Sequence, residues 1–172
     1  MSTVTPENRP LLLVDIDGVL SLFGPPARPG EAALPLGDGT WHQVEGIAHL
    51  LSSRAAAHLL DLRPHFDLVW CSGWEERANE HLPHLLGLPV LPTLSFDRNP
   101  GKGRAHWKLA AIDAYAGPDR PLAWVDDALD DGCRAWAAAR PGPTLLVDTA
   151  SHTGLTAAEV ATLRAFAASL AA

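Results

Sequence analysis

The chain has 172 residues, of which 47% are hydrophobic, and it carries a formal net charge of −7. This length suits one ordinary domain with a substantial core, and we expect residues 1–172 to form it. The acidic balance argues against a general affinity for nucleic acid. The two cysteines lack the spacing of a disulfide framework, no apolar run approaches the ~20 residues of a membrane span, and the polar N-terminus lacks a signal peptide. We therefore expect a cytoplasmic protein without membrane contact.

The first third of the chain is predicted to hold an arm, a strand, an insertion and a helix. Residues 1–10 are polar and form a loose arm, and the apolar run at 11–16 forms a buried strand. Residues 24–46 are rich in Gly and Pro and form a flap-sized insertion, with a short hairpin that turns at Asp38-Gly39. Apolar residues at helical spacing then predict a helix over about 47–62.

The rest of the chain alternates between predicted strands and helices. Apolar runs bounded by turn residues predict strands at about 66–71, 90–96, 121–125 and 144–147. A helix opens at Glu75, and further helices are predicted at about 104–116, 129–140 and 156–171. Because strands and helices alternate, we expect an α/β fold, a Rossmann-like three-layer sandwich with a central, mostly parallel five-stranded sheet.

Two acids follow the first predicted strand. In the segment LLLVDIDGVL, Asp15 and Asp17 lie where the strand ends and a turn begins. This edge is where open α/β sheets bind ligands. Carboxylates so close together repel each other unless a cation or a shared proton lies between them. The pattern therefore predicts a hard metal ion, and Mg²⁺ suits it best.

Four further polar residues follow a predicted strand or lie on a predicted helix. Ser72 follows the strand at 66–71, Asp126 and Asp127 follow a later strand, and Lys108 lies on a helix. Since parallel strands end at the same sheet edge, we expect these groups to converge with the first two acids. Such a set suits phosphoryl transfer, in which a carboxylate attacks phosphorus and a second carboxyl moves the proton. A hydroxyl and an ammonium would hold the phosphoryl oxygens, and further acids would hold Mg²⁺.

In this order the segments resemble the four motifs of the haloacid dehalogenase (HAD) superfamily, in particular its phosphatases. DIDGV resembles the first motif, Ser72 after LVWC the second, Lys108 the third and WVDDALDD the fourth. The resemblance covers most of the chain. It implies a Mg²⁺-dependent phosphoester hydrolase that works through an aspartyl phosphate. The second acid, Asp17, favours a phosphatase over a dehalogenase, which typically lacks this acid.

The resemblance also implies a role for each residue. Asp15 would be the nucleophile, and Asp17 would be the general acid and base, with its backbone carbonyl touching the metal. Ser72 and Lys108 would bind the phosphoryl group, and Lys108 would also neutralise charge on the nucleophile. The metal ligands implied in this way are Asp15, Asp17, Asp126 and Asp127.

Some assignments stay open at this point. Lys102, in the loop NPGKGR, is an alternative to Lys108, which we prefer because a helix positions a catalytic group better than a loop does. Either Asp126 or Asp127 is the direct metal ligand, and Asp127 is preferred. The spacing also allows an outer acid at one of two positions, Asp130 or Asp131.

The expected substrate follows from the lack of a large cap domain, since the insertions at about 24–46 and 97–104 are short. Capless relatives often act on phosphoproteins or nucleic-acid ends, and others act on small substrates after oligomerising. The acidic charge leaves nucleic acid only as a substrate end, although the chain also resembles family members associated with RNA repair. The alternative function is a catalytically silent or regulatory module that binds a phosphorylated partner, and an intact Asp17 argues against it. No oligomeric state is predicted.

Overall fold

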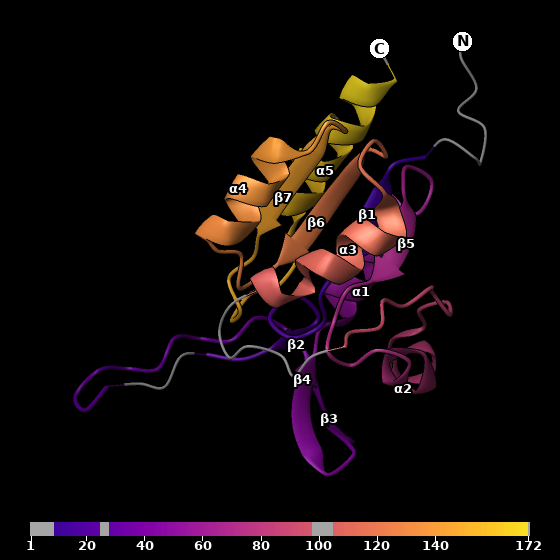
Figure 1. Cartoon of the computed structure of the whole chain (residues 1–172). Coiled ribbons are helices and arrows are strands. Elements are labelled where there is room, and N and C mark those ends of the chain that lie inside the picture. The colour runs from indigo at the N-terminus through magenta and orange to yellow at the C-terminus, as the bar shows by residue number, and fades with distance from the viewer. Residues whose placement is uncertain (1–8, 25–27, 98–104, 172) are drawn as a thin grey trace.

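The computed structural model describes residues 9–24, 28–97 and 105–171, which form two sheets and the helices around them (Figure 1). The larger sheet is parallel and has four strands in the order β5-β1-β6-β7. These strands are β1 (Leu11–Val14), β5 (Asp67–Trp70), β6 (Leu122–Asp126) and β7 (Thr144–Asp148). Strand β1 lies between β5 and β6, so its apolar side chains are buried on both faces, as a continuous apolar run requires.

Helices cover both faces of this sheet. They are α1 (Ser53–Leu62), α2 (Arg77–Leu86), α3 (Leu109–Ala116), α4 (Asp131–Ala139) and α5 (Ala157–Leu170), with a 3-10 turn η2 (His106–Lys108) before α3. Successive strand residues face opposite ways. Leu12 and Val14 therefore pack in one core with α1 and α5, whereas Leu11 and Leu13 pack in the other with α3 and α4. The expected α/β architecture is confirmed, and Figure 1 shows α3 and α4 in front of the sheet.

The predicted fifth strand is not a strand of the structure. The segment 90–96 makes a single parallel bridge to β5, in which the Trp70 N–H donates to the Pro92 carbonyl and the Leu94 N–H donates to the Trp70 carbonyl. The next bond of a parallel ladder would need an N–H at residue 92 to reach the carbonyl of Leu68. Proline has no N–H, so the ladder stops after one residue and the sheet has four strands rather than five.

A second, antiparallel sheet lies at the carboxyl edge of the parallel strands, in the order β2-β4-β3 (Figure 1). Its strands are β2 (Ser21–Leu22), β3 (Thr40–Val44) and β4 (Ile47–Leu51). We call residues 40–51 the flap hairpin. The predicted turn at Asp38-Gly39 is wrong, because the chain turns at Glu45 and Gly46, where φ is 51° and 82°. A two-residue hairpin turn of this kind needs positive φ at both positions.

The helix predicted over 47–62 is correspondingly shorter. Residues 47–51 form β4, and α1 begins at Ser53, after Ser52 as N-cap. The Ser52 hydroxyl accepts a hydrogen bond from the Ala55 N–H at 3.1 Å, which satisfies one of the free N–H groups of the first turn. In contrast, the predicted start of α5 is confirmed, including the capping box of Thr156 and Glu159. None of the helices in the described part of the chain is long and apolar enough to cross a membrane.

Candidate active site

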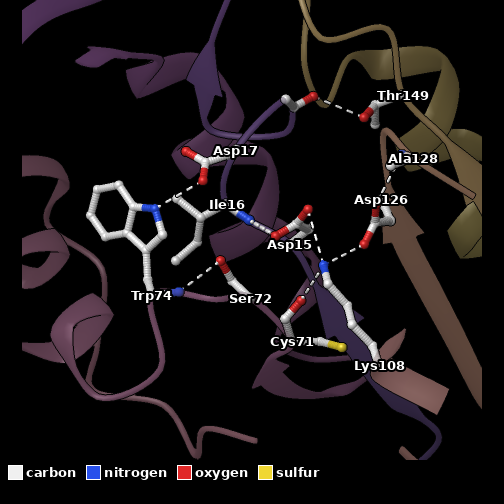
Figure 2. A network of polar contacts seen from close by, with 11 residues as sticks. Asp15, Ile16, Asp17, Cys71, Ser72, Trp74, Lys108, Asp126, Ala128 and Thr149 are labelled. Carbon is white, nitrogen blue, oxygen red and sulfur yellow. Dashed lines mark hydrogen bonds and ion pairs between the residues drawn. The ribbon is translucent and has the colours of Figure 1, made fainter. Parts of the chain in front are cut away.

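The polar residues expected to converge lie at the carboxyl edge of the parallel sheet (Figure 2). Asp15 directly follows β1, Ser72 follows β5, and Asp126 is the last residue of β6. Lys108 ends the η2 turn that opens α3, and it reaches the same edge from the helical layer. The structure therefore brings together residues that are as far apart in the sequence as 15 and 126.

Lys108 lies at the centre of this group. Its Nζ donates hydrogen bonds to Asp126 Oδ2 at 2.6 Å and to the Cys71 carbonyl at 2.9 Å, and it lies 3.1 Å from Asp15 Oδ2. An ammonium has three N–H donors, so these three acceptors satisfy it. The side chain is only 4% exposed, so the two ion pairs are little screened by water. Lys102, the alternative, lies outside the described residues.

Three carboxylates form an acidic cluster beside this lysine. Asp15, Asp126 and Asp127 each offer one oxygen, and these oxygens all lie within 4.8 Å of one another. Backbone groups hold one oxygen in two of these acids, since Asp15 Oδ1 accepts from the Ile16 N–H at 2.8 Å and Asp126 Oδ1 from the Ala128 N–H at 2.9 Å. Lys108 supplies one positive charge to three acids. The donor set therefore suits a hard divalent cation, which prefers carboxylate oxygens.

The electrostatics of the cluster reflect this surplus of negative charge. Burial raises the pKa of Asp15 to about 8, against the lowering effect of Lys108. Burial and the neighbouring Asp126 raise the pKa of Asp127 to about 6. Burial lowers the pKa of Lys108, but the two carboxylates outweigh this effect and raise it overall, so the ammonium stays charged. Without a cation the cluster retains protons near neutral pH, and a bound cation would displace them.

We expect the metal-free protein to lose stability as the pH rises from about 4 to about 8. The pKa of Asp15 is about 8 in the folded chain and 3.8 ordinarily, so the folded state binds more protons than the unfolded state in this window. The free energy of unfolding then falls as the pH rises. Urea unfolding in the presence of a chelator at both ends of the window measures the effect. Asp15→Asn should flatten the dependence, and an equal slope in both proteins contradicts the expectation.

The loop after β1 contacts residues that follow two other strands, β6 and β7. Gly18 has a φ of +75°, and a Cβ at this position would lie 2.2 Å from the side chain of Asp127. Only glycine permits both the backbone conformation and the close approach. The Gly18 carbonyl accepts a hydrogen bond from Thr149 Oγ1 at 2.9 Å, directly after β7. In the sequence, the only signal for Thr149 is a hydroxyl that follows a predicted strand.

Asp17 lies on the other side of this loop and points away from the acidic cluster, toward Trp74 (Figure 2). Its side chain is 51% exposed, and its Oδ2 accepts a hydrogen bond from Trp74 Nε1 at 3.2 Å. Burial of the carboxyl by surrounding protein atoms raises the pKa of Asp17. The hydrogen bond from the Trp74 N–H favours the charged carboxylate, and it is the strongest of the effects that lower this pKa. His49 of the flap hairpin lies near, with its Nδ1 3.9 Å from Asp17 Oδ1. A hollow of about 280 Å³ opens here between the flap hairpin and the start of α2.

Three other predicted residues have clear positions. Ser72 is buried, and its Oγ accepts a hydrogen bond from the Trp74 N–H at 3.3 Å. Asp130 is the N-cap of α4, and it also contacts His106 Nδ1 at 2.7 Å. Asp131 is exposed in the first turn of α4. Asp130 and Asp131 therefore have structural explanations of their own, in helix capping and in the favourable dipole of the helix N-terminus.

Comparison with known proteins gives a family match. A family model described as the HAD domain in Swiss Army Knife RNA repair proteins matches residues 11–160. The matched range begins with β1 and ends inside α5, so it includes every residue of the candidate site. No curated protein matches the chain.

Proposed function

Because the chain belongs to the family of HAD domains in Swiss Army Knife RNA repair proteins, we propose that it is a Mg²⁺-dependent phosphomonoester hydrolase. The observation that carries this proposal is buried Lys108 in contact with both Asp15 and Asp126, beside a further acid, Asp127. A nucleophilic carboxylate, an ammonium and a cation site then surround the place of one phosphoryl group. These are the groups needed for in-line attack and for offsetting the charge that develops.

The reaction proceeds in two steps on the side chains of the site. Asp15 attacks phosphorus, the bond from phosphorus to the leaving oxygen breaks, and Asp17 donates its proton to that oxygen. Asp17 then takes a proton from water, the water oxygen attacks the aspartyl phosphate, and inorganic phosphate leaves with Asp15 regenerated. The Ile16 N–H fixes one oxygen of Asp15, and Lys108 faces the other. Ser72, which is buried, binds a phosphoryl oxygen through its Oγ.

The acidic cluster fits the metal that the family implies. Asp15 and Asp127 would hold Mg²⁺ through carboxylate oxygens, together with the backbone carbonyl of Asp17. Mg²⁺, when bound, offsets negative charge on the phosphoryl group. Lys108 Nζ lies closer to Asp126 Oδ2, at 2.6 Å, than to Asp15 Oδ2, at 3.1 Å, so we assign Asp126 as the acid that holds Lys108 and Asp127 as the direct ligand beside Asp15.

We expect Mg²⁺ to raise the midpoint of thermal unfolding of the wild-type protein, because a ligand that binds only the folded state stabilises it. Asp127→Asn should lose most of this rise, since it removes one carboxylate of the cluster. Asp131→Asn is the matched control, because it removes an exposed acid of the same segment. Equal Mg²⁺-induced shifts in the Asp127→Asn and Asp131→Asn proteins would exclude the assignment of Asp127.

The proposed substrate class is the phosphorylated end of an RNA strand. Two observations support it: the family model is that of a domain in RNA repair proteins, and, among the described residues, the hollow at Asp17 is bordered by the short flap hairpin and by residues 73–77 rather than by a large cap domain. The net charge of −7 suits contact with a strand end better than contact along a strand. Phosphate release is measured from end-phosphorylated oligonucleotides, phosphopeptides and small phosphate esters, with Mg²⁺ or a chelator. If folded protein releases phosphate from none of them, the result favours the alternative function, a phospho-ligand-binding module.

A further inference from the structure

The side chain of Trp74 is held in a fixed orientation beside Asp17. The residue is 7% exposed, and its backbone N–H is bonded to Ser72 Oγ. Its ring lies edge-on to the His49 ring, with 4.8 Å between the ring centroids and 67° between the planes. His49 is fixed in turn, because its Nδ1 lies 2.8 Å from the hydroxyl of buried Ser21. The flap hairpin therefore contacts the indole through the His49 ring.

The indole N–H of Trp74 is aimed at a carboxylate, whereas other indoles of the core are not aimed at any acceptor. Among the described residues, Trp70 and Trp124 bury their Nε1 atoms without a hydrogen-bond partner. Trp74 Nε1 instead donates to Asp17 Oδ2 at 3.2 Å. The contact holds a half-exposed acid that would otherwise sample several rotamers.

We propose that Trp74 is a positioning residue, which fixes the Asp17 carboxyl so that its proton is carried on Oδ1. In a protonated carboxyl the carbonyl-type oxygen is the better acceptor, so an N–H bond to Oδ2 leaves the O–H on Oδ1. Asp17 itself lines the hollow between the flap hairpin and α2, and we assign this hollow to the leaving group because the general acid borders it. This inference rests on the proposed function, since it assigns a role in the departure of the leaving group.

The test replaces Trp74 with Phe, which keeps an aromatic ring and removes the N–H. We compare kcat/KM for p-nitrophenyl phosphate, whose leaving group needs little protonation, with kcat/KM for an alkyl phosphate, whose leaving group needs a proton. This parameter reports the formation of the aspartyl phosphate, the step in which the leaving group departs. The alkyl-to-aryl ratio should fall by roughly 10-fold or more, because general acid catalysis contributes about 10²–10⁴-fold. Asp17→Asn should lower the same ratio further.

The matched control is Trp136→Phe, which removes an indole N–H that donates to Asp113 at 2.9 Å, away from the site. It should leave the ratio unchanged. An equal loss on both substrates in Trp74→Phe means a structural role and overturns the inference, as does no change in the ratio. If wild-type protein releases phosphate from neither ester nor from an end-phosphorylated oligonucleotide, the proposed function itself fails.

A second measurement follows the hydrogen bond directly. In the indole region of a ¹H–¹⁵N spectrum, the signal that disappears in Trp74→Phe should shift in Asp17→Ala, while the signal of Trp136 should stay in place. An unshifted Trp74 signal overturns the inference regardless of activity.

Discussion

Asp15→Asn is expected to lower kcat for phosphate release by roughly 10³-fold or more, because an amide cannot form the aspartyl phosphate. The substitution keeps the size and shape of the side chain. It also removes a carboxyl whose pKa is raised by burial to about 8, so the metal-free variant should be at least as stable as the wild-type protein at neutral pH. Loss of activity is then separable from loss of folding.

Two measurements test this prediction. One is kcat for p-nitrophenyl phosphate in the presence of Mg²⁺, and the other is the free energy of unfolding in urea. Asp61→Asn is the control, since Asp61 is an exposed acid on α1, away from the sheet edge. It should retain wild-type turnover. A folded Asp15→Asn protein that keeps more than about a tenth of wild-type kcat would contradict the assignment of Asp15 as nucleophile.

Lys108→Met is expected to destabilise the protein by about 3–5 kcal/mol, in addition to removing its activity. Methionine has a similar length and no charge, so the variant leaves Asp15 and Asp126 buried beside each other without a cation. Breaking a buried pair costs more than breaking an exposed one, because the charge left behind has lost both its partner and water. The measurement is urea unfolding near pH 7 in the presence of a chelator.

The control for this prediction is Arg134→Met, which breaks the exposed pair of Arg134 with Asp148. An exposed pair contributes at most about 1 kcal/mol, so this variant should remain close to the wild-type protein. The double variant Lys108→Met, Asp126→Asn should regain part of the lost stability, because it removes one of the two buried acids that no longer have a cationic partner. It should regain none of the activity. If Lys108→Met is as stable as Arg134→Met, the buried pairs do not stabilise the fold.

The carboxyl edge could be predicted from sequence because each part of it has a local signal. Asp15 and Asp126 each come at the end of an apolar run, and the alternation with helices makes those strands parallel. Parallel strands then have to end at one edge, so residues far apart in the chain meet there. The positions of Asp15 and Asp126 follow from these rules without any knowledge of their contacts, whereas the choice of Lys108 over Lys102 depended on its place on a helix.

The flap hairpin could not be predicted in the same way. The apolar residues Ile47, Leu50 and Leu51 suit both a helical stripe and a strand with one covered face, and periodicity alone cannot separate these. The true turn contains Glu45 at positive φ, which is uncommon for glutamate, whereas Asp38-Gly39 has the usual turn sequence.

The contacts of Asp17 with Trp74 and His49 also could not be predicted from the local sequence. Trp74 lies 57 positions away in the chain, and His49 comes from the misassigned helix, so no spacing connects them with Asp17. Trp74 next to Ser72 equally suits core packing, and its 7% exposure agrees with that. Only the direction of its N–H distinguishes the two interpretations, and side-chain direction is set by tertiary structure.

Residues inserted at the tip of the flap hairpin would enlarge the cover over the Asp17 side of the site. Glu45 is anchored to α2 by an ion pair with Arg77 at 2.8 Å, while a Cβ on Gly46 would meet no atom within 4 Å. Extra residues added at this bend would extend outward from a secured base and leave the pairing of β3 with β4 intact. Selectivity for the leaving group could thus change by elongation of one bend, without disturbing the strand ends that carry out the chemistry.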